Sequence, residues 1–396
     1  MSDTPTDCCT DPGQNLLSVE QGRKRILAGV SAIEASEQLH LRAALGRILC
    51  APVVSEIDVP PFANSAMDGY AVRSEDCPDS AAVALDIIGS AFAGAPFAGR
   101  VGGGQCVRIM TGAVLPDGAD AVLMQEHVNR EQGQIRCENR AVQRGQNVRY
   151  AGEDTRRGDT VLPAGRRLGA AELGLLASVG VAEVCVTRKL RVAFFSTGDE
   201  LARVGAPLVR GQIYDSNRYA LFGMLSRPDI ECYDLGVIPD RREAVRTAFR
   251  EAAAMADLVL TSGGVSVGEA DYVTETLGEL GEISFWRMAM KPGKPLAFGR
   301  LGNAVFFGLP GNPVSVMATF YQFVLPAIRK MTAQQALEPL LIQARSVQDL
   351  KKAPGRMEFQ RGILQRGADG QWQVSTTGIQ GSHVLSSMSR ANCFIL

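Results

Sequence analysis

The chain has 396 residues, 46% of them hydrophobic and 21% charged, which is typical of a globular protein with two to four domains. Its 41 basic and 42 acidic side chains give a formal net charge of -1, which argues against binding nucleic acid or a membrane surface through bulk charge. No apolar run is long enough to span a bilayer, and the N-terminus lacks the basic and apolar regions of a signal peptide. We therefore expect a cytoplasmic protein.

The first half of the chain predicts a tail and two N-terminal domains. Residues 1–14 are polar and predict a disordered tail. Residues 15–57 and 146–182 contain helical periodicity and turns, and we expect them to form one N-terminal domain together. Residues 58–145 are rich in Gly, Val and Ala in short alternating runs, which predicts a β-rich domain inserted between those two parts.

The second half predicts an α/β domain followed by a small β domain. Residues 183–335 alternate apolar strands such as "KLRVAFF" and "DLVLTS" with helical segments. This alternation predicts a doubly wound, mostly parallel sheet covered by helices on both faces. Residues 336–396 contain short alternating runs and an Asp-Gly turn at Asp369, which predicts a hairpin in a small C-terminal β domain. The fold class is therefore α/β and multidomain.

The number and spacing of the cysteines and histidines restrict the kinds of metal site that the chain can form. The nine cysteines include no Cys-x-x-Cys pair and are mostly scattered singly through apolar runs. This pattern favours buried, reduced thiols over a thiolate metal site. The chain has only three histidines, which excludes a histidine-rich metal site.

Three polar loops follow strands of the predicted α/β domain: "STGDEL", "SGGVSVGEADY" and "GLPGNP". Ligands bind beyond the carboxyl ends of the strands in such sheets. Glycine and serine favour an anion, whereas Glu200 and Asp271 would repel one. A divalent cation removes the conflict, because Mg²⁺ takes carboxylate and phosphate oxygens together. The loops therefore predict a Mg²⁺-dependent site for a phosphorylated ligand, the alternative being that either acid caps a helix.

The turn "KPGKP" is the sharpest local feature. It contains Lys291 and Lys294, two of only seven lysines in the chain, and a proline follows each of them. Lysines in a rigid turn are suited to bind phosphate or another tetrahedral oxyanion, although a solvated turn is the alternative. Whether this turn lies at the same edge of the sheet depends on the direction of the strand before it.

Several common catalytic motifs are absent from the sequence. There is no P-loop, no G-x-G-x-x-G after a strand and no H-E-x-x-H, and the one G-x-S-x-G run, "GVSVG", lies inside the glycine loop "SGGVSVGEADY". The chain is therefore not a P-loop NTPase, and catalysis through a serine triad is not expected. The N-terminal half adds polar turns around Asp68, Thr111 and Asp154, each of which would be ordinary by itself.

As an ordered set, the motifs resemble the molybdopterin molybdenumtransferase family over nearly the whole chain. The set comprises "PPFANSAMDGYA", "RIMTGA", "GED", "FSTGDEL", "GQIYDSNR", "TSGGVSVGEADY", "KPGKP" and "GLPGNPVS". The resemblance implies four domains, an elongated homodimer and a site in a cleft shared by two subunits. It also implies a reaction of adenylylated molybdopterin with molybdate and Mg²⁺, which yields molybdenum cofactor and AMP.

The resemblance also implies the roles of individual residues. The candidate catalytic residues are Asp68, Thr111, Asp154, Glu200, Asp240 and Asp271. The candidate residues for the pterin phosphate are Gly263, Gly264, Ser266, Pro310, Gly311 and Pro313. The candidate residues for molybdate are Lys291, Lys294, Arg361 and Ser382. Glu200 and Asp271 are also the candidate ligands of Mg²⁺.

Two other functions are alternatives to molybdenum insertion. One is molybdopterin adenylylation, which shares the α/β domain but needs ATP, and the other is a non-catalytic scaffold that uses the same fold. The N-terminal half, which contains the motif "SAMDGYA", favours molybdenum insertion over adenylylation. The sequence also lacks the long linkers and fused domains of such scaffolds. The resemblance further suggests the molybdopterin adenylyltransferase and molybdoenzyme maturation proteins as partners. Because the family continues past the "NCFI" strand, whereas this sequence ends at Leu396, we expect an incomplete last domain with an unpaired edge.

Overall fold

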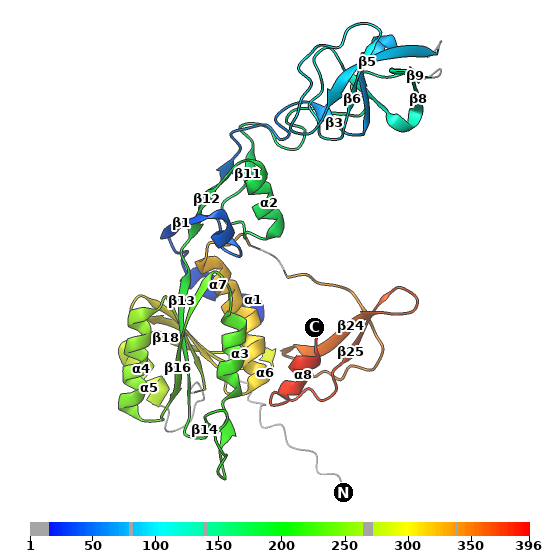
Figure 1. Ribbon diagram of the computed structural model, residues 1–396. Helices are drawn as coiled ribbons and strands as arrows, with labels where there is room; N and C mark the ends of the chain where they lie inside the picture. Colours follow the sequence, from blue (N-terminus) through cyan, green and yellow to red (C-terminus); the bar gives the residue numbers. More distant parts are fainter. Residues whose placement is uncertain (1–15, 79–81, 138–140, 264–271, 337–338) are drawn as a thin grey trace.

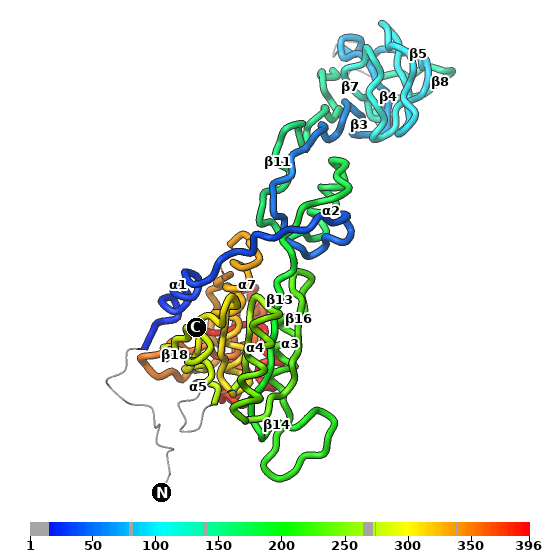
Figure 2. The backbone as a smooth tube through the Cα atoms, turned by 90° about the vertical axis from the view of Figure 1, so that its left-hand side faces the viewer, coloured from blue at the N-terminus to red at the C-terminus, as the bar shows by residue number. Residues whose placement is uncertain are grey.

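The molecule is elongated, with its domains arranged along one axis (Figure 1). The computed structural model describes residues 16–78, 82–137, 141–263, 272–336 and 339–396. The α/β domain and the C-terminal domain lie at one end, a β-rich domain lies at the other, and a narrow middle domain separates them. Figure 2 shows the same arrangement after a 90° turn. No helix among the described residues is long and apolar enough to cross a membrane.

A six-stranded sheet in the order β16-β13-β17-β21-β20-β18 forms the centre of the α/β domain. Its strands are β13 (Leu190–Thr197), β16 (Ile230–Ile238), β17 (Leu258–Ser262), β18 (Gly281–Arg287), β20 (Pro295–Leu301) and β21 (Ala304–Leu309). The first four neighbours run parallel, and β20 is antiparallel to both β21 and β18. Every residue of β17 and of β21 is buried, because helices cover both faces. The predicted α/β fold class is confirmed.

Helices cover the two faces of this sheet unequally (Figure 1). On one face lie α1 (Val19–Gly29), α3 (Ser216–Leu225), α6 (Pro313–Thr319), the π-helical segment η4 (Phe320–Val324) and α7 (Leu325–Met331). On the other face lie α4 (Arg242–Met255) and α5 (Tyr272–Leu280). Phe249 of α4 contacts Phe195 and Phe306 edge-to-face, with ring centroids 5.2 and 5.6 Å apart.

The domain boundaries differ from the prediction in two places. Helix α1, expected in the N-terminal domain, packs on α7 and η4, because Val19 and Ile26 join the core of the α/β domain. Strand β12 (Glu183–Thr187), expected in the α/β domain, pairs with β1 (Ser36–His40) in the middle domain. Both helix α1 and strand β12 are placed by contacts between segments distant in sequence.

The middle domain is built from the two stretches that flank the inserted domain. It contains β1 and β12, β2 (Val53–Val54) paired with β11 (Thr160–Leu162), and α2 (Ala170–Ser178). Beyond it, β3 (Asn64–Ser65) pairs with β10 (Val148–Arg149). The distal domain holds a six-stranded sheet in the order β7-β4-β6-β5-β9-β8. These strands are β4 (Gly69–Val72), β5 (Val83–Ala91), β6 (Gln105–Ile109), β7 (Ala121–Met124), β8 (Val128–Glu131) and β9 (Gln134–Cys137).

The C-terminal domain is a small sheet with one helix. Its elements are β22 (Arg345–Ser346), β23 (Met357–Glu358), β24 (Gln360–Arg366), β25 (Trp372–Thr376), α8 (Leu385–Arg390) and β26 (Cys393–Ile395). The predicted hairpin is formed by β24 and β25, and Gly370 in its turn has a φ of +76°. Strand β26 pairs with β24 and lies at an edge of the sheet order β22-β25-β24-β26.

One pair of cysteines departs from the expectation of reduced thiols. Cys50 and Cys185 form a disulfide with their Cα atoms 5.7 Å apart, so the expectation is wrong for this pair. The N–H of Cys50 donates to the carbonyl of Cys185, which brings together residues 135 positions apart. Burial raises the pKa of the Cys77 and Cys106 thiols to about 12, in keeping with inert core residues.

An ion pair fixes the amino ends of the central strands. Arg188 donates two hydrogen bonds to the Asp257 carboxylate at 2.7 and 2.8 Å, and the Arg191 N–H donates a third at 2.9 Å. Burial acts to raise the pKa of Asp257, but the bonds and charges of Arg188 and Arg191 outweigh it and lower that pKa. The stabilisation is therefore present above the ordinary aspartate pKa and is lost as pH falls through the lower folded value.

We predict that Asp257→Asn lowers the free energy of unfolding by about 1–2 kcal/mol at pH 7, because charge-assisted hydrogen bonds are lost. The difference from wild type should shrink as the pH falls below about 4, where the wild-type carboxylate is also protonated. Urea unfolding followed by circular dichroism at several pH values measures this difference. The exposed Asp349 provides the control variant Asp349→Asn, and a pH-independent difference would contradict the prediction.

Candidate functional site

The loops after β13, β17 and β21 lie side by side at one edge of the sheet. Ser196 is in register with Ser262, and Ser262 with Leu309. The chain leaves β13 toward α3 on one face and leaves β17 toward α5 on the other, so this edge is a topological switch point, where a ligand crevice is expected. Strand β18 runs parallel to β21, since both are antiparallel to β20, so the "KPGKP" turn that follows β18 lies at this same edge.

Two glycines allow the first two loops to approach closely. Gly198 has a φ of +139° and Gly263 a φ of +90°. A Cβ at Gly198 would lie 2.3 Å from Oε2 of Glu200, and a Cβ at Gly263 would lie 3.1 Å from the carbonyl oxygen of Thr197. The N–H of Gly263 donates to the carbonyl of Leu309 at 3.2 Å. Gly263 therefore bends the loop, and its own N–H is already engaged within the protein.

Asn217 connects two of these loops, and the sequence analysis assigned it no role. Its Nδ2 donates to Oγ of Ser262 at 2.8 Å and to the carbonyl of Gly311 at 2.6 Å. The residue lies in the first turn of α3, where Asp215 caps the helix and accepts a hydrogen bond from Ser196. Asn217 is therefore a positioning residue. Its signal in the sequence was an Asp-Ser-Asn start to a helix that packs on the sheet.

The acidic candidates have different surroundings. Glu200 is exposed and lies just before the short strand β14 (Leu201–Ala202), so it does not cap a helix. The loop after β16 joins the same region, because the N–H of Asp240 donates to Oδ1 of Asp199 at 3.1 Å. Asp271 lies outside the described residues, as do Gly264 and Ser266.

The C-terminal domain docks on the lysine turn and on the start of α6. Strand β19 (Met290–Lys291) pairs with β23, and the N–H of Phe359 donates to the carbonyl of Lys291 at 2.8 Å. The N–H of Val314 in α6, just after Pro310 and Pro313, donates to the carbonyl of Ser382 at 3.1 Å. The candidate molybdate residues Lys291, Lys294 and Ser382 are thereby brought to one junction between two domains.

Two candidates at this junction have internal partners. Nζ of Lys291 lies 3.3 Å from Oε1 of Glu358, whose side chain is 8% exposed. Arg361 is 1% exposed, and it donates to Oγ of Ser387 at 3.0 Å and to the carbonyl of Gly381 at 3.1 Å. Burial lowers the pKa of Arg361, although nearby Glu358 acts in the opposite direction. Arg361 therefore holds the loop that carries Ser382.

Asp68, Thr111 and Asp154 are not brought to this edge within one chain. Asp68 and Thr111 lie in the distal domain, on the far side of the middle domain from the α/β loops (Figure 1). Oδ1 of Asp68 accepts hydrogen bonds from the Thr111 hydroxyl at 2.7 Å and from its N–H at 2.8 Å. These two bonds, the hydroxyl first, lower the pKa of the exposed Asp68 carboxyl. Asp154 lies between the distal and middle domains, where its N–H donates to the carbonyl of Val59.

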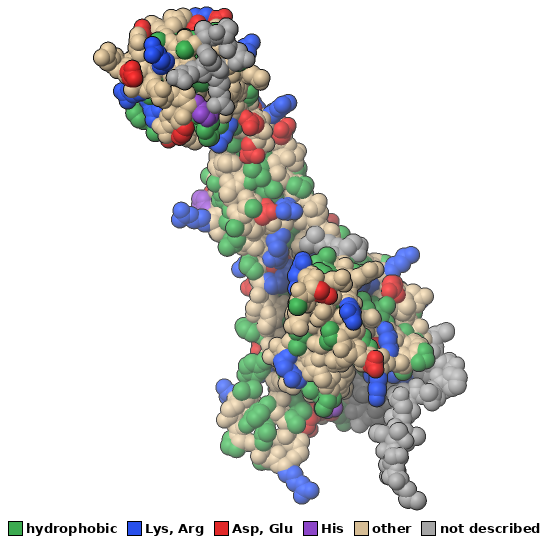
Figure 3. Space-filling view, turned by 90° about the vertical axis from the view of Figure 1, so that its right-hand side faces the viewer, with side chains coloured by type: hydrophobic (Ala, Val, Ile, Leu, Met, Phe, Trp, Pro, Cys, Tyr) green, Lys and Arg blue, Asp and Glu red, His purple; other side chains and the backbone are tan. Residues whose placement is uncertain are grey.

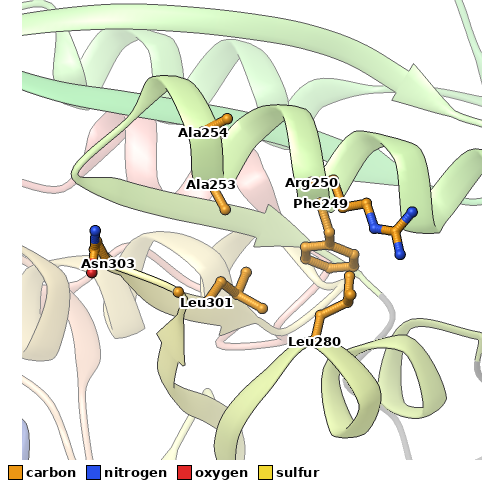
Figure 4. Close-up of a pocket in the computed structure, with 8 residues that line it drawn as sticks. Phe249, Arg250, Ala253, Ala254, Leu280, Leu301 and Asn303 are labelled. Atoms are coloured by element: carbon orange, nitrogen blue, oxygen red, sulfur yellow. The ribbon is translucent and has the colours of Figure 1, made fainter.

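A separate cavity of about 340 Å³ lies at the opposite edge of the sheet (Figure 4). Phe249, Leu280 and Leu301 form its apolar wall, and Arg250 and Asn303 lie at its margin. It borders the turn between β20 and β21, away from the carboxyl ends of the parallel strands. The cavity is therefore not part of the candidate site.

Known family models match the three parts of the chain in order. Residues 17–180 match the MoeA N-terminal region (domain I and II), residues 193–330 match a probable molybdopterin binding domain, and residues 343–396 match the MoeA C-terminal region (domain IV). A molybdopterin molybdenumtransferase of Haemophilus influenzae is 46% identical over 382 residues, which cover 96% of this chain and 94% of the relative. The chain belongs to the molybdopterin molybdenumtransferase family.

Further similarities agree with this membership. A molybdopterin molybdenumtransferase of a Nostoc strain is 40% identical over 356 residues, covering 88% of this chain and 81% of the relative. The crystal structure of a molybdopterin biosynthesis moeA protein from Pyrococcus horikoshii superposes with a TM-score of 0.82 at 31% identity, covering 96% of this chain and 95% of that one. The resemblance inferred from the motifs is confirmed, and the chain is a transferase.

We predict that Thr111→Val raises the pKa of the Asp68 carboxyl toward its ordinary value, because the larger of its two stabilising hydrogen bonds is lost. The Thr111 N–H bond remains, so the shift should be only partial. A carbon-13 NMR titration of the side-chain carboxyls measures this pKa. Thr155→Val, between the distal and middle domains, is the control, and an unchanged Asp68 titration in Thr111→Val would contradict the assigned cause.

Proposed function

We propose that the chain transfers molybdenum from molybdate to adenylylated molybdopterin, forming molybdenum cofactor and releasing AMP with the help of Mg²⁺. The observation that most supports this reaction is the meeting of the Glu200 loop, the Asn217-linked loops and the lysine turn at one edge of the sheet. A phosphorylated ligand and a tetrahedral oxyanion can be held side by side there. We place this reaction in the cytoplasm.

The described residues near the crevice are compatible with Mg²⁺. Glu200 is exposed and makes no hydrogen bond or ion pair with any other described side chain, so its oxygens are available. No group of three or more His, Cys, Asp or Glu that could hold a metal occurs among the described residues. Mg²⁺ needs no such cage, because one or two carboxylates, substrate phosphates and waters suffice. Glu200 and Asp271 would hold the ion, which when bound would neutralise charge on the departing phosphate.

The chain's own residues would hold the two substrates on adjacent surfaces. Asn217 fixes the loops of Ser262 and Gly311 against each other, so the pterin phosphate would meet a preformed surface. Lys294 has no hydrogen bond or ion pair with another described side chain, and its ammonium group is available to molybdate. The ion pair with Glu358 restricts Lys291, and Arg361 holds the loop of Ser382. No covalent intermediate with the protein is needed.

We also propose that two copies of the chain complete each site. Asp68 and Thr111 lie at the opposite end of the molecule from the α/β loops, and their hydrogen-bonded carboxylate is exposed. In a symmetric dimer, the distal domain of one subunit can reach the α/β edge of the other. The molybdopterin adenylyltransferase would then supply the substrate, and molybdoenzyme maturation proteins would receive the product.

We predict that Glu200→Gln slows AMP release by about 100-fold or more, because charge stabilisation of several kcal/mol would be weakened. The assay incubates the protein with adenylylated molybdopterin, molybdate and Mg²⁺ and follows AMP. Glu243→Gln, an exposed acid on α4, should retain the wild-type rate. Equal rates for Glu200→Gln and wild type at limiting Mg²⁺ would contradict the metal assignment. Pyrophosphate release from molybdopterin and ATP, without AMP release from adenylylated molybdopterin, would indicate adenylylation instead.

We predict that the inactive variants Asp68→Asn and Lys294→Gln complement each other when co-expressed with different tags. In a mixed dimer one site carries both changes and the other carries neither, so random assembly should restore about one quarter of wild-type activity. The purified mixed dimer isolates this effect from the parent dimers. If the mixed dimer is as inactive as each parent, Asp68 and Lys294 do not act across the subunit boundary.

A further inference from the structure

Two arginines contact one carboxylate where the middle domain meets the α/β domain, and a third arginine lies close enough that burial and their charges lower its pKa. Arg167 lies before α2 in the middle domain, Arg227 lies between α3 and β16, and Arg329 lies in the last turn of α7. The carboxylate is that of Asp229, which is 3% exposed. We call these four residues the junction cluster. They lie at the amino ends of the parallel strands, since the carbonyl of Asp229 accepts the N–H of Leu190 at the start of β13.

Both Arg227 and Arg167 contact the Asp229 carboxylate. Arg227 donates from Nε to Oδ1 at 3.1 Å and from Nη2 to Oδ2 at 2.8 Å. Nη2 of Arg167 lies 2.7 Å from Oδ1, as an ion pair without hydrogen-bond geometry. This Nη2 is buried and has no hydrogen-bond partner among the described residues. Asp229 therefore neutralises one positive charge of the cluster, and a buried donor remains unused.

Arg329 adds a third positive charge that no described residue balances. Its side chain makes no hydrogen bond or ion pair with another described side chain. Burial, followed by the positive charges of Arg227 and Arg167, lowers the pKa of Arg329. Three guanidinium groups and one carboxylate give the cluster a net charge of about +2. Partly buried like charges repel each other with little screening by salt, so a bound anion would relieve this repulsion.

The cluster bridges two domains in close contact. Gly46 of the middle domain has a φ of +75°, and a Cβ there would lie 2.6 Å from the ring of Pro228, next to Asp229. After α7, the N–H of Gln335 donates to the carbonyl of Gly165 in the middle domain at 2.9 Å. Figure 3 shows Lys and Arg side chains gathered where the narrow middle of the molecule meets the α/β domain. An anion bound there would contact both domains at once.

We propose that the junction cluster binds a tetrahedral oxyanion such as phosphate or sulfate, which ties the middle domain to the α/β domain. Guanidinium groups match this ligand because they are planar, permanently charged and able to donate two parallel hydrogen bonds to its oxygens. A dianion also balances the net charge of the cluster. Asp229 keeps Arg167 and Arg227 together in the absence of the ion, so the site is largely preformed.

The experiment measures phosphate binding to the full chain by calorimetry and thermal unfolding, with chloride controls at matched ionic strength. Every protein carries Lys294→Gln, which weakens anion binding at the lysine turn. In this background Arg329→Gln should weaken phosphate binding by about tenfold or more, since one charge-assisted interaction is lost. Arg329→Lys should bind with intermediate affinity, and Arg345→Gln, an exposed arginine of the C-terminal domain, should bind as the parent does.

The unfolding temperatures provide a second readout that a purely structural arginine would not reproduce. Without phosphate, Arg329→Gln should be at least as stable as its parent, because repulsion is relieved. With phosphate, the parent should gain stability and Arg329→Gln should gain little. Equal phosphate responses in the two proteins would overturn the proposal, as would a loss of stability in Arg329→Gln that is independent of phosphate. AMP is titrated in parallel to distinguish a free inorganic ion from the phosphate group of a nucleotide. A response to AMP but not to phosphate or sulfate would overturn a site for the free ion.

Discussion

The side-chain amide of Asn217 is the contact on which the arrangement of the site depends. Its Nδ2 donates to Ser262 after β17 and to Gly311 after β21, so one small group sets the separation of two loops. Asp215 anchors the same helix turn to β13 through Ser196. The first turn of α3 thus ties together the carboxyl ends of three parallel strands. An amide suits this position because it donates two hydrogen bonds without adding charge to the surface that we propose binds phosphate.

The oxyanion part of the site depends on the docking of a second domain. The lysine turn pairs with β23, and α6 binds the carbonyl of Ser382, so the C-terminal domain is held at two points. Glu358 would be costly to bury by itself, and Lys291 supplies the compensating charge. Arg361 uses its donors inside its own domain, which makes it a support for the Ser382 loop. The candidate oxyanion surface therefore combines the lysine turn of the α/β domain with the Ser382 loop of the C-terminal domain.

Local patterns were sufficient to predict the sheet, the loops at its edge and the family. Alternating apolar strands and helices determine a doubly wound sheet, and glycine beside acid at strand ends marks the crevice. Contacts between distant segments were not predictable in this way. The packing of α1 on α7, the pairing of β12 with β1 and the Cys50–Cys185 disulfide each join residues far apart in sequence. The ion pair between Lys291 and Glu358 was equally unpredictable, because nothing in the sequence "GRMEFQRG" indicates which residue Glu358 contacts.

In the proposed dimer, the elongated shape makes the joint between domains part of the chemistry. Asp68 lies at the far end of an arm that begins at the middle domain, so a small rotation at the base of the arm becomes a large displacement at Asp68. The junction cluster lies at that base, and its charges are only partly balanced. Close contact of Gly46 with Pro228 limits rotation by sterics, whereas the arginines limit it by electrostatics. In the proposed dimer, neutralising this charge would stiffen the joint, so an ion bound far from the crevice would influence how often the arm reaches the partner's site.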